Sequence, residues 1–263
     1  MGDLSGKNPT GRFTGLASTY AQYRPDYPPA AIDFIQNHCG LTPRSVLVDV
    51  GCGTGISSRL FAARGLQVIG IEPNADMRSK AQAEHVPVGS PVPEYRDGKA
   101  EATGLPDGSA DAVVAAQAFH WFQPEAALVE FHRILKRGGW VALVWNEREE
   151  SDAFTAAYGA VIRTAPDTAA VEGPRGRAGE AILRSNLFTR SERVCFTNEQ
   201  ALDEEGVLGR AFSASYAPKN AEQAAAFAAS LRQVFRHFQK GNRVSLRYQT
   251  SVYVGRRAGS RRR

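Results

Sequence analysis

The stretch Val46-Leu-Val-Asp-Val-Gly-Cys-Gly-Thr-Gly55 decides the fold of this chain. A short apolar run rich in β-branched residues is typical of a central strand that is covered on both faces. The run ends in glycines at every second position, and glycine permits a tight turn and a close approach of a ligand to the backbone. Ile56, Leu60 and Ala63 then follow at helical spacing. The stretch therefore predicts a buried strand, a glycine turn and a helix, in that order.

The next segment, Gln67-Val-Ile-Gly-Ile-Glu72, reads as a second strand with a carboxylate at its carboxyl end. This order predicts a nucleotide-binding βαβ unit in which Glu72 accepts both ribose hydroxyls. A glycine turn that merely joins strand to helix is the alternative, and the order of strand, acid, glycines, helix and second acid argues against it.

The spacing of the glycines narrows the choice of ligand. In a dinucleotide fingerprint the third glycine comes three residues after the second, whereas here it comes two after. A Walker loop is excluded because no Lys-Ser or Lys-Thr pair follows the glycines. Asp49, just before them, would repel a pyrophosphate but suits a cationic ligand.

The pattern Asp49-x-Gly-x-Gly-x-Gly55 resembles motif I of the class I S-adenosylmethionine-dependent methyltransferases. In that family the acidic residue lies near the methionine amino group, and the glycines flank the methionine and ribose portions. The resemblance implies S-adenosylmethionine as the cofactor. The cofactor-binding residues that it implies come from motif I, from the end of the second strand and from later family segments: Asp49, Gly51, Cys52, Gly53, Gly55, Glu72, Pro73, Met77, Ala100, Glu101, Gln117 and Trp121.

Three later segments narrow the resemblance further. Ala100-Glu-Ala-Thr-Gly-Leu-Pro106, Gln117-Ala-Phe-His-Trp-Phe122 and Glu130-Phe-His-Arg-Ile-Leu-Lys-Arg-Gly-Gly139 look like the branch that contains trans-aconitate and cantharidin methyltransferases. Ubiquinone-pathway C-methyltransferases share the Leu-Pro turn and the Lys-x-Gly-Gly ending. The resemblance thus favours a small-molecule acceptor, with a carboxylic acid first, and leaves phenols, quinones and other metabolites open.

Strand patterns alternate with helix patterns along the first half of the chain. We expect helices to Gly65, from Asn74 to about Glu84 and from Gln123 to Gly138, and strands over 95–100, 111–116 and 140–145. This order predicts an α/β fold, a Rossmann-like doubly wound seven-stranded sheet with an inserted helical cap. The expected parts are a cofactor-binding core with an N-terminal lid segment (1–145), a helical cap or substrate region with an additional core strand (146–243), and a last core strand with a basic tail (244–263).

Polar side chains of the lid segment and of the cap are the candidates for binding the acceptor. In the family that this chain resembles, an N-terminal segment folds over the cofactor ahead of the first helix. An arginine there can bind a carboxylate through two hydrogen bonds, and tyrosines can donate hydroxyls; packing on the sheet is the alternative. The candidates are Tyr20, Tyr23, Arg24, Tyr27, Arg148 and Tyr216, with Arg210 as a further cap residue.

His120 is the one histidine that the order of elements brings near the transferred methyl group. A carboxylate acceptor needs no base at neutral pH, whereas an alcohol, phenol or amine can need one, so His120 is the candidate general base. Lining the pocket and plain packing are its alternative roles.

Composition sets limits on the other function classes. No run of about 18 apolar residues and no signal-peptide pattern occurs, so we expect a cytoplasmic protein without a membrane partner. The three cysteines show no metal-ligand or disulfide spacing, and we expect no metal. The net charge of +5 equals the charge of five arginines near the C-terminus, without which 27 basic residues face 27 acidic ones. A solvated basic tail is the favoured interpretation, and nucleic-acid binding is a minor alternative.

Overall fold

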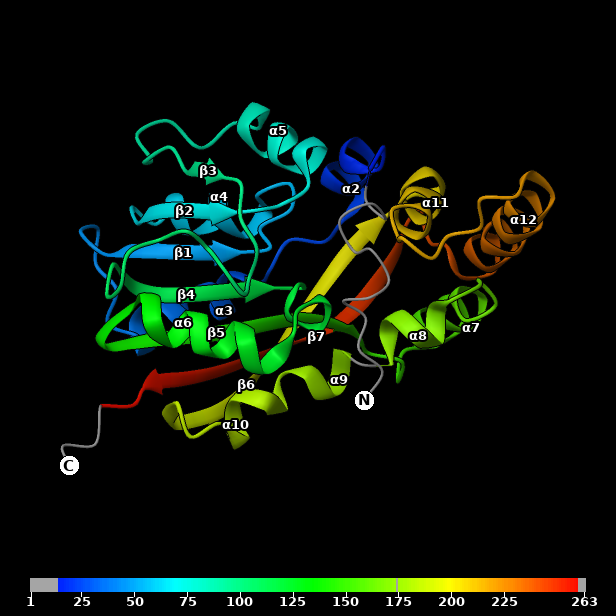
Figure 1. Ribbon diagram of the computed structural model, residues 1–263. Coiled ribbons are helices and arrows are strands. Elements are labelled where there is room, and N and C mark those ends of the chain that lie inside the picture. Colours follow the sequence, from blue (N-terminus) through cyan, green and yellow to red (C-terminus); the bar gives the residue numbers. More distant parts are fainter. Residues whose placement is uncertain (1–13, 174, 260–263) are drawn as a thin grey trace.

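The computed structural model describes residues 14–173 and 175–259. Its centre is a seven-stranded sheet in the order β3-β2-β1-β4-β5-β7-β6 (Figure 1). The strands are β1 (Val46–Val50), β2 (Gln67–Ile71), β3 (Glu94–Arg96), β4 (Ala110–Ala116), β5 (Leu135–Arg148), β6 (Phe188–Leu202) and β7 (Val244–Arg257). β1 to β5 run parallel, and β7 runs antiparallel to both of its neighbours. The predicted doubly wound sheet is therefore confirmed.

Helices cover both faces of the sheet, and each face has its own apolar core. The helices around the sheet are α3 (Pro29–His38), α4 (Ile56–Ala62), α5 (Ala75–Ala83), α6 (Pro124–Ile134) and α10 (Glu180–Arg184). Phe131 of α6 belongs to one core and Phe61 of α4 to the other. Along β1, Val48 faces the first core and Leu47 the second. Burial on both sides explains why this strand is an unbroken apolar run up to Asp49.

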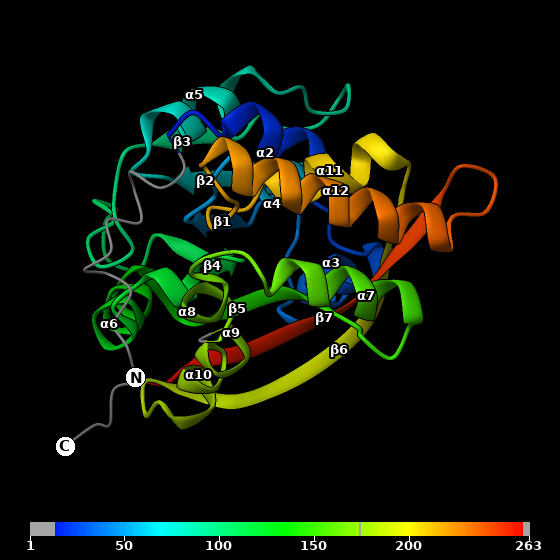
Figure 2. The ribbon, with the colours of Figure 1, turned by 90° about the vertical axis from the view of Figure 1, so that its right-hand side faces the viewer.

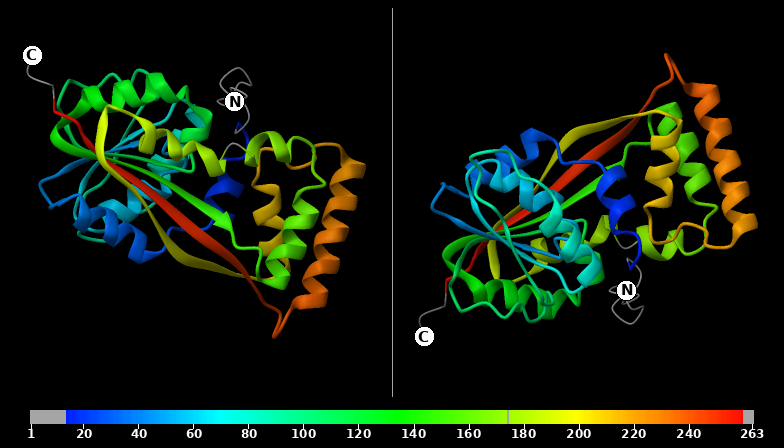
Figure 3. Two further views of the ribbon diagram at one scale, coloured as in Figure 1. Left: turned by 90° about the horizontal axis from the view of Figure 1, so that it is seen from below. Right: turned by 90° about the horizontal axis from the view of Figure 1, so that it is seen from above.

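A helical cap stands at the far end of the sheet, where β6 and β7 extend beyond β5 (Figures 2 and 3). Its helices are α7 (Ala153–Ile162), α8 (Thr168–Glu172), α11 (Glu204–Phe212) and α12 (Ala221–Phe238). The last β5–β7 pair is Arg148 with Tyr248, whereas β6 and β7 stay paired out to Leu202 with Val244. The protruding strand pair supplies Tyr248 and Leu246 to a third apolar core, which is made with the cap helices.

The lid segment differs from its expected form, because Tyr20 and Tyr23 do not precede the first helix but belong to one. This helix, α2 (Ala17–Tyr23), contacts both α5 and α11 (Figures 1 and 3). Another short helix, α9 (Arg175–Ala178), follows α8 in the chain. None of the helices in the described ranges is long and apolar enough to cross a bilayer.

Two predicted element boundaries differ from those in the structure. The third strand ends at Arg96 instead of continuing to Ala100, because the chain turns away at Gly98, where a Cβ would lie 2.8 Å from Ile71 Cγ2. The helix α6 ends at Ile134 and not at the glycine pair, which lies in β5. Gly139 packs against the backbone of β4, where a Cβ on this residue would lie only 2.8 Å from Asp111 O.

Of the five arginines assigned to the basic tail, Arg256 and Arg257 belong to β7. Arg256 Nε donates to Gly138 O at 3.1 Å. The other three, at 261–263, lie outside the described residues. The prediction of a solvated tail is therefore wrong for the first two.

Candidate active site

A cavity of about 370 Å³ opens at the carboxyl ends of β1, β2 and β4. Parallel strands of a doubly wound sheet place ligands at this edge. Most of the predicted cofactor-binding residues line it, namely Gly51, Cys52, Gly53, Glu72, Pro73, Met77, Ala100, Glu101, Gln117 and Trp121. Tyr20 and Tyr27 of the predicted acceptor set line it as well. Asp49 and Gly55 do not belong to the lining.

Glu72 connects the second strand to the glycine turn. Its Oε2 accepts from Gly53 N and its Oε1 from Asn74 N, both at 2.9 Å. Burial raises the pKa of Glu72 above its ordinary value, although these two backbone hydrogen bonds oppose the rise. Asn74 caps α5 as predicted, through a hydrogen bond that its side chain accepts from Met77 N at 3.0 Å. The carboxylate is thus fixed at the mouth of the turn, beside the cavity.

Asp49 lies directly beneath the turn and is fully buried. Its Oδ2 accepts from the hydroxyls of Ser57 and Ser58, each at 2.6 Å. Its Oδ1 is buried and has no hydrogen-bond partner in the described part of the chain. Burial raises the pKa of Asp49, against the lowering effect of the serine hydrogen bonds. A carboxylate with one oxygen unpaired, next to the cavity-lining Ser57, suits a cationic ligand group.

Gly55 serves packing and not the cavity wall. Its φ of +75° lies in the left-handed region, and a Cβ there would overlap Tyr95 Oη and lie 2.9 Å from Tyr95 Cζ. The ring of Tyr95 also crosses Gly70, where a Cβ would lie 2.5 Å from Cδ1. The two glycines therefore make room for one aromatic ring between β3 and the motif.

His120 lies behind the cavity, on the turn η2 (Phe119–Trp121). Its Nδ1 accepts from Trp145 Nε1 at 3.3 Å, so the neutral ring carries its proton on Nε2. The cavity lining includes its neighbour Trp121 but not His120 itself. Gln117, at the end of β4, has a φ of +56° and donates from Nε2 to Asn146 O at 3.1 Å. Gln117 and Trp121 therefore line the cavity, whereas His120 does not.

Tyr23 and Arg24 connect the end of α2 to the cap through hydrogen bonds. Tyr23 Oη donates to Glu205 Oε1 at 2.8 Å, and Arg24 Nη2 donates to Ser213 O at 3.1 Å. The guanidinium of Arg24 lies 4.6 Å from the ring centre of Tyr20. Both residues therefore act between α2 and the α11 region, while Tyr20 reaches the cavity.

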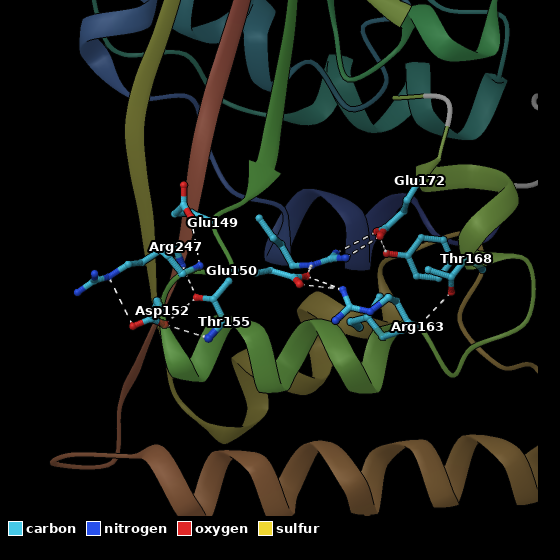
Figure 4. Close-up of polar contacts among 12 residues, drawn as sticks. Glu149, Glu150, Asp152, Thr155, Arg163, Thr168, Glu172 and Arg247 are labelled. Atoms are coloured by element: carbon cyan, nitrogen blue, oxygen red, sulfur yellow. Dashed lines mark hydrogen bonds and ion pairs between the residues drawn. The ribbon is translucent and has the colours of Figure 1, made fainter. Parts of the chain in front are cut away.

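Arg148 and Tyr216 meet inside the cap, on one carboxylate. Arg148 donates from both Nη atoms to the two oxygens of Glu172, at 3.0 and 2.6 Å, and Tyr216 Oη donates to Glu172 Oε1 at 2.6 Å (Figure 4). Neither residue lines the cavity. Sequence patterns gave no sign of Glu172 as their shared partner.

Comparison with known proteins identifies the family. A methyltransferase-domain family model matches residues 48–143. An uncharacterised methyltransferase of Mycobacterium tuberculosis H37Rv is 37% identical over 150 residues, which make up 57% of this chain and 58% of that protein. A ubiquinone biosynthesis O-methyltransferase of Chromobacterium violaceum is 32% identical, over 57% of this chain and 67% of its own length. The chain belongs to the class I S-adenosylmethionine-dependent methyltransferases. Its matched region spans under two thirds of the mycobacterial relative.

Solved structures agree with this methyltransferase fold. A protein of Anaeromyxobacter dehalogenans, assigned as a type II methyltransferase, is 24% identical with a TM-score of 0.60, over 90% of this chain and 97% of that one. A geranyl diphosphate methyltransferase in complex with S-adenosylmethionine is 18% identical with a TM-score of 0.51, over 88% and 85% of the two chains. At these identities the structures show the shared fold alone.

Sequence reasoning missed part of the cavity wall of this methyltransferase. The additional lining residues are Thr54, Ile56, Ser57, Gly98, Lys99, Ala116, Ala118, Phe122 and Gln123. Ser57 had a local signal, since it follows the last glycine by two residues, in the first turn of α4. Gly98 and Lys99 had none, because they enter the wall only where the chain turns away after β3. Within 14–173 and 175–259, no group of three or more His, Cys, Asp and Glu residues could hold a metal ion.

Proposed function

We propose that the protein transfers the methyl group of S-adenosylmethionine to a small-molecule acceptor, and that this acceptor is a carboxylic acid methylated on oxygen. The observation that carries the methyl-transfer proposal is the cavity itself, with Glu72 on its wall and the unpaired Asp49 Oδ1 beneath it. The buried Arg210 of the cap, which has no ion-pair partner among the described residues, supports an acidic acceptor. The resemblance to the trans-aconitate and cantharidin branch points the same way.

Residues on the cavity wall and beneath it would bind different parts of the cofactor. Asp49 would attract the methionine ammonium, and Glu72 would accept hydrogen bonds from the two ribose hydroxyls. The bound cofactor supplies an electrophilic methyl group on a cationic sulfur. Tyr20 and Tyr27, on the lid side, would exclude water and help to align the acceptor. A carboxylate acceptor needs no general base, which fits the place of His120 behind the wall.

The methylation of a phenol or quinone is the second candidate. It is favoured by the similarity to the ubiquinone biosynthesis O-methyltransferase, which shares 32% identity over 67% of that relative's length. N-, S- and C-methylation stay open within the same proposal. We also propose a cytoplasmic location, since Cys39, Cys52 and Cys195 are free thiols, as is usual in a reducing compartment.

Labelled methyl transfer decides between these acceptors. The full chain is incubated with methyl-labelled S-adenosylmethionine and a panel of carboxylic acids and phenols, and the products are then treated with mild base. We expect label released as methanol, because a methyl ester hydrolyses under conditions that leave an aryl ether intact. Base-stable label would contradict carboxyl methylation and favour the phenol candidate.

Cofactor affinity should depend on pH through Asp49. Its pKa is raised by burial, so in the unliganded protein ionisation of Asp49 is disfavoured and its contribution to stability falls as pH rises through that pKa. The ionised form alone attracts the ammonium, so we expect S-adenosylmethionine to bind progressively more weakly as pH falls through the raised pKa of Asp49. Calorimetric titration at a series of pH values checks it.

Asp49→Asn is the control for the pH effect. It should bind roughly tenfold more weakly at about pH 8, as expected for one charge-assisted hydrogen bond, and should lose part of the pH dependence. Glu72 titrates in both proteins, so the difference between them reports Asp49. Parallel pH profiles would contradict its role.

A further inference from the structure

The cap buries an arginine that no carboxylate neutralises. Arg210, on α11, is 5% exposed. Its only side-chain hydrogen bond within the described ranges runs from Nε to Tyr248 Oη at 3.0 Å, and no acidic group there lies within ion-pair distance of it. A buried guanidinium stays charged, and an unpaired buried charge is strongly unfavourable. Binding of an anion that is not part of the described chain would therefore stabilise this side chain.

The nearby acidic groups are already taken. Both oxygens of Glu172 pair with Arg148. Glu150 lies 3.5 Å from Arg148 Nε and 2.7 Å from Arg163 Nη1 (Figure 4). Glu172 and Glu150 therefore pair with Arg148 and Arg163, and neither of them pairs with Arg210.

An unpaired hydroxyl lies in the same core. Tyr158, on α7, is 1% exposed, and its Oη has no hydrogen-bond partner in the described part of the protein. Tyr248, which accepts the hydrogen bond from Arg210 Nε, belongs to the same apolar core as Tyr158, so the two side chains lie in one part of the cap. Burial raises the pKa of Tyr158, and the charge of Arg210 opposes the rise. A buried hydroxyl without a partner is rare in native proteins and points to a bound group.

The pair lies close to the cofactor cavity. Trp121 lines the cavity and also packs against the apolar core of the cap, which contains Tyr158 and Tyr248. On the sheet side, the cavity residue Gln117 binds the carbonyl of Asn146, two residues before Arg148. The cavity and the core that contains Tyr158 and Tyr248 therefore share Trp121 as a common boundary.

We propose that Arg210, together with the Tyr158 hydroxyl, binds a carboxylate of the acceptor that is remote from the methylated atom. This inference rests on the proposed function. A carboxylate carries the negative charge that the unpaired guanidinium lacks, and its two oxygens match the guanidinium fork. A carboxylate held in this way is a poor nucleophile, so it anchors the acceptor while a second group accepts the methyl. The acceptor class is therefore a small molecule with a carboxylate and a separate nucleophile, such as a dicarboxylic acid.

Acetate binding tests this proposed carboxylate site of Arg210 and Tyr158, called the anchor, before the acceptor is known. Melting temperatures of the full chain are compared in sodium acetate, in acetamide and in sodium chloride at equal concentration. Acetate alone should raise the melting temperature of the wild type, by about 3 °C for a site filled to roughly ten times its Kd. Arg210→Met should abolish the acetate effect, and Tyr158→Phe should reduce it. Arg232→Met, which removes a half-exposed arginine of α12 paired with Glu204, should keep it.

Two further results separate this inference from the proposed function. Without acetate, Arg210→Met should melt at or above the wild type, because an uncompensated buried charge has been removed. If the labelled-methyl assay finds a dicarboxylic acceptor, the KM for that acceptor should rise at least about 30-fold in Arg210→Met, while the KM for S-adenosylmethionine stays unchanged.

An acetate effect that survives in Arg210→Met overturns the anchor, and so does its absence from the wild type. An Arg210-dependent acetate effect without methyl transfer to any acceptor overturns the proposed function alone. Methyl transfer with an acceptor KM that Arg210→Met leaves unchanged overturns the anchor alone.

Discussion

Replacing Glu72 by alanine should weaken S-adenosylmethionine binding roughly 150-fold, a loss of about 3 kcal/mol. Hydrogen bonds to a charged group contribute about 1.5–3 kcal/mol each, and we propose two of them to the ribose. The change also removes the acceptor of Gly53 N and Asn74 N, so the glycine turn loses the group that orders it. Isothermal titration calorimetry measures the effect directly.

Glu94→Ala is the matched control, because it removes the same charge from the exposed edge strand β3, where Glu94 pairs with Arg96. It should leave the cofactor affinity unchanged. Glu72→Gln should fall between the two, since the amide keeps one acceptor oxygen. An unaltered affinity of Glu72→Ala would remove the ribose role that the motif predicts.

Replacing Gly55 by alanine should lower the free energy of unfolding by about 3 kcal/mol. The left-handed conformation costs a non-glycine residue roughly 1–2 kcal/mol. Overpacking against Tyr95, whose Cζ would lie 2.9 Å from the new Cβ, adds about 1–3 kcal/mol. Urea denaturation, followed by a fluorescence signal, measures the difference.

Gly108→Ala separates the two causes, because Gly108 has a φ of +61° but no atom within 4 Å of the position that a Cβ would take. It should cost only the conformational part, about 1–2 kcal/mol. Adding Tyr95→Phe to Gly55→Ala removes the overlapping hydroxyl and should recover part of the loss. Equal losses for the two glycine variants would mean that Tyr95 yields freely and that the packing role of Gly55 is wrong.

The core of the fold could be predicted because its signals are local. The apolar run before Asp49 needs only its own residues to indicate a strand that is covered on both faces. Asn74 caps α5 because its side chain reaches Met77 N within one helical turn. Glu72 follows its strand directly, so the sequence order alone places it at the ligand-binding edge.

Local signals were weaker where an element depends on distant neighbours. The additional core strand predicted within 146–243 is β6, which extends from Phe188 to Leu202 because it pairs with β7 from end to end. The glycine pair at the predicted end of α6 lies instead in β5, where Gly139 meets the backbone of β4. Neither partner lies near in sequence.

Sequence by itself determined the family, the cofactor and most of the residues that line the cavity, because a glycine turn and a strand-end carboxylate act within a few residues of each other. Tertiary structure alone decided which polar side chains of the lid and cap are paired. Arg24 binds Ser213 O across 189 positions, and Arg148 finds Glu172 on a separate helix. Arg210 is left without a carboxylate among the residues that the structure describes. No spacing rule predicts such pairings, because a charge in a low-dielectric core depends on every group that folding brings within a few ångströms of it.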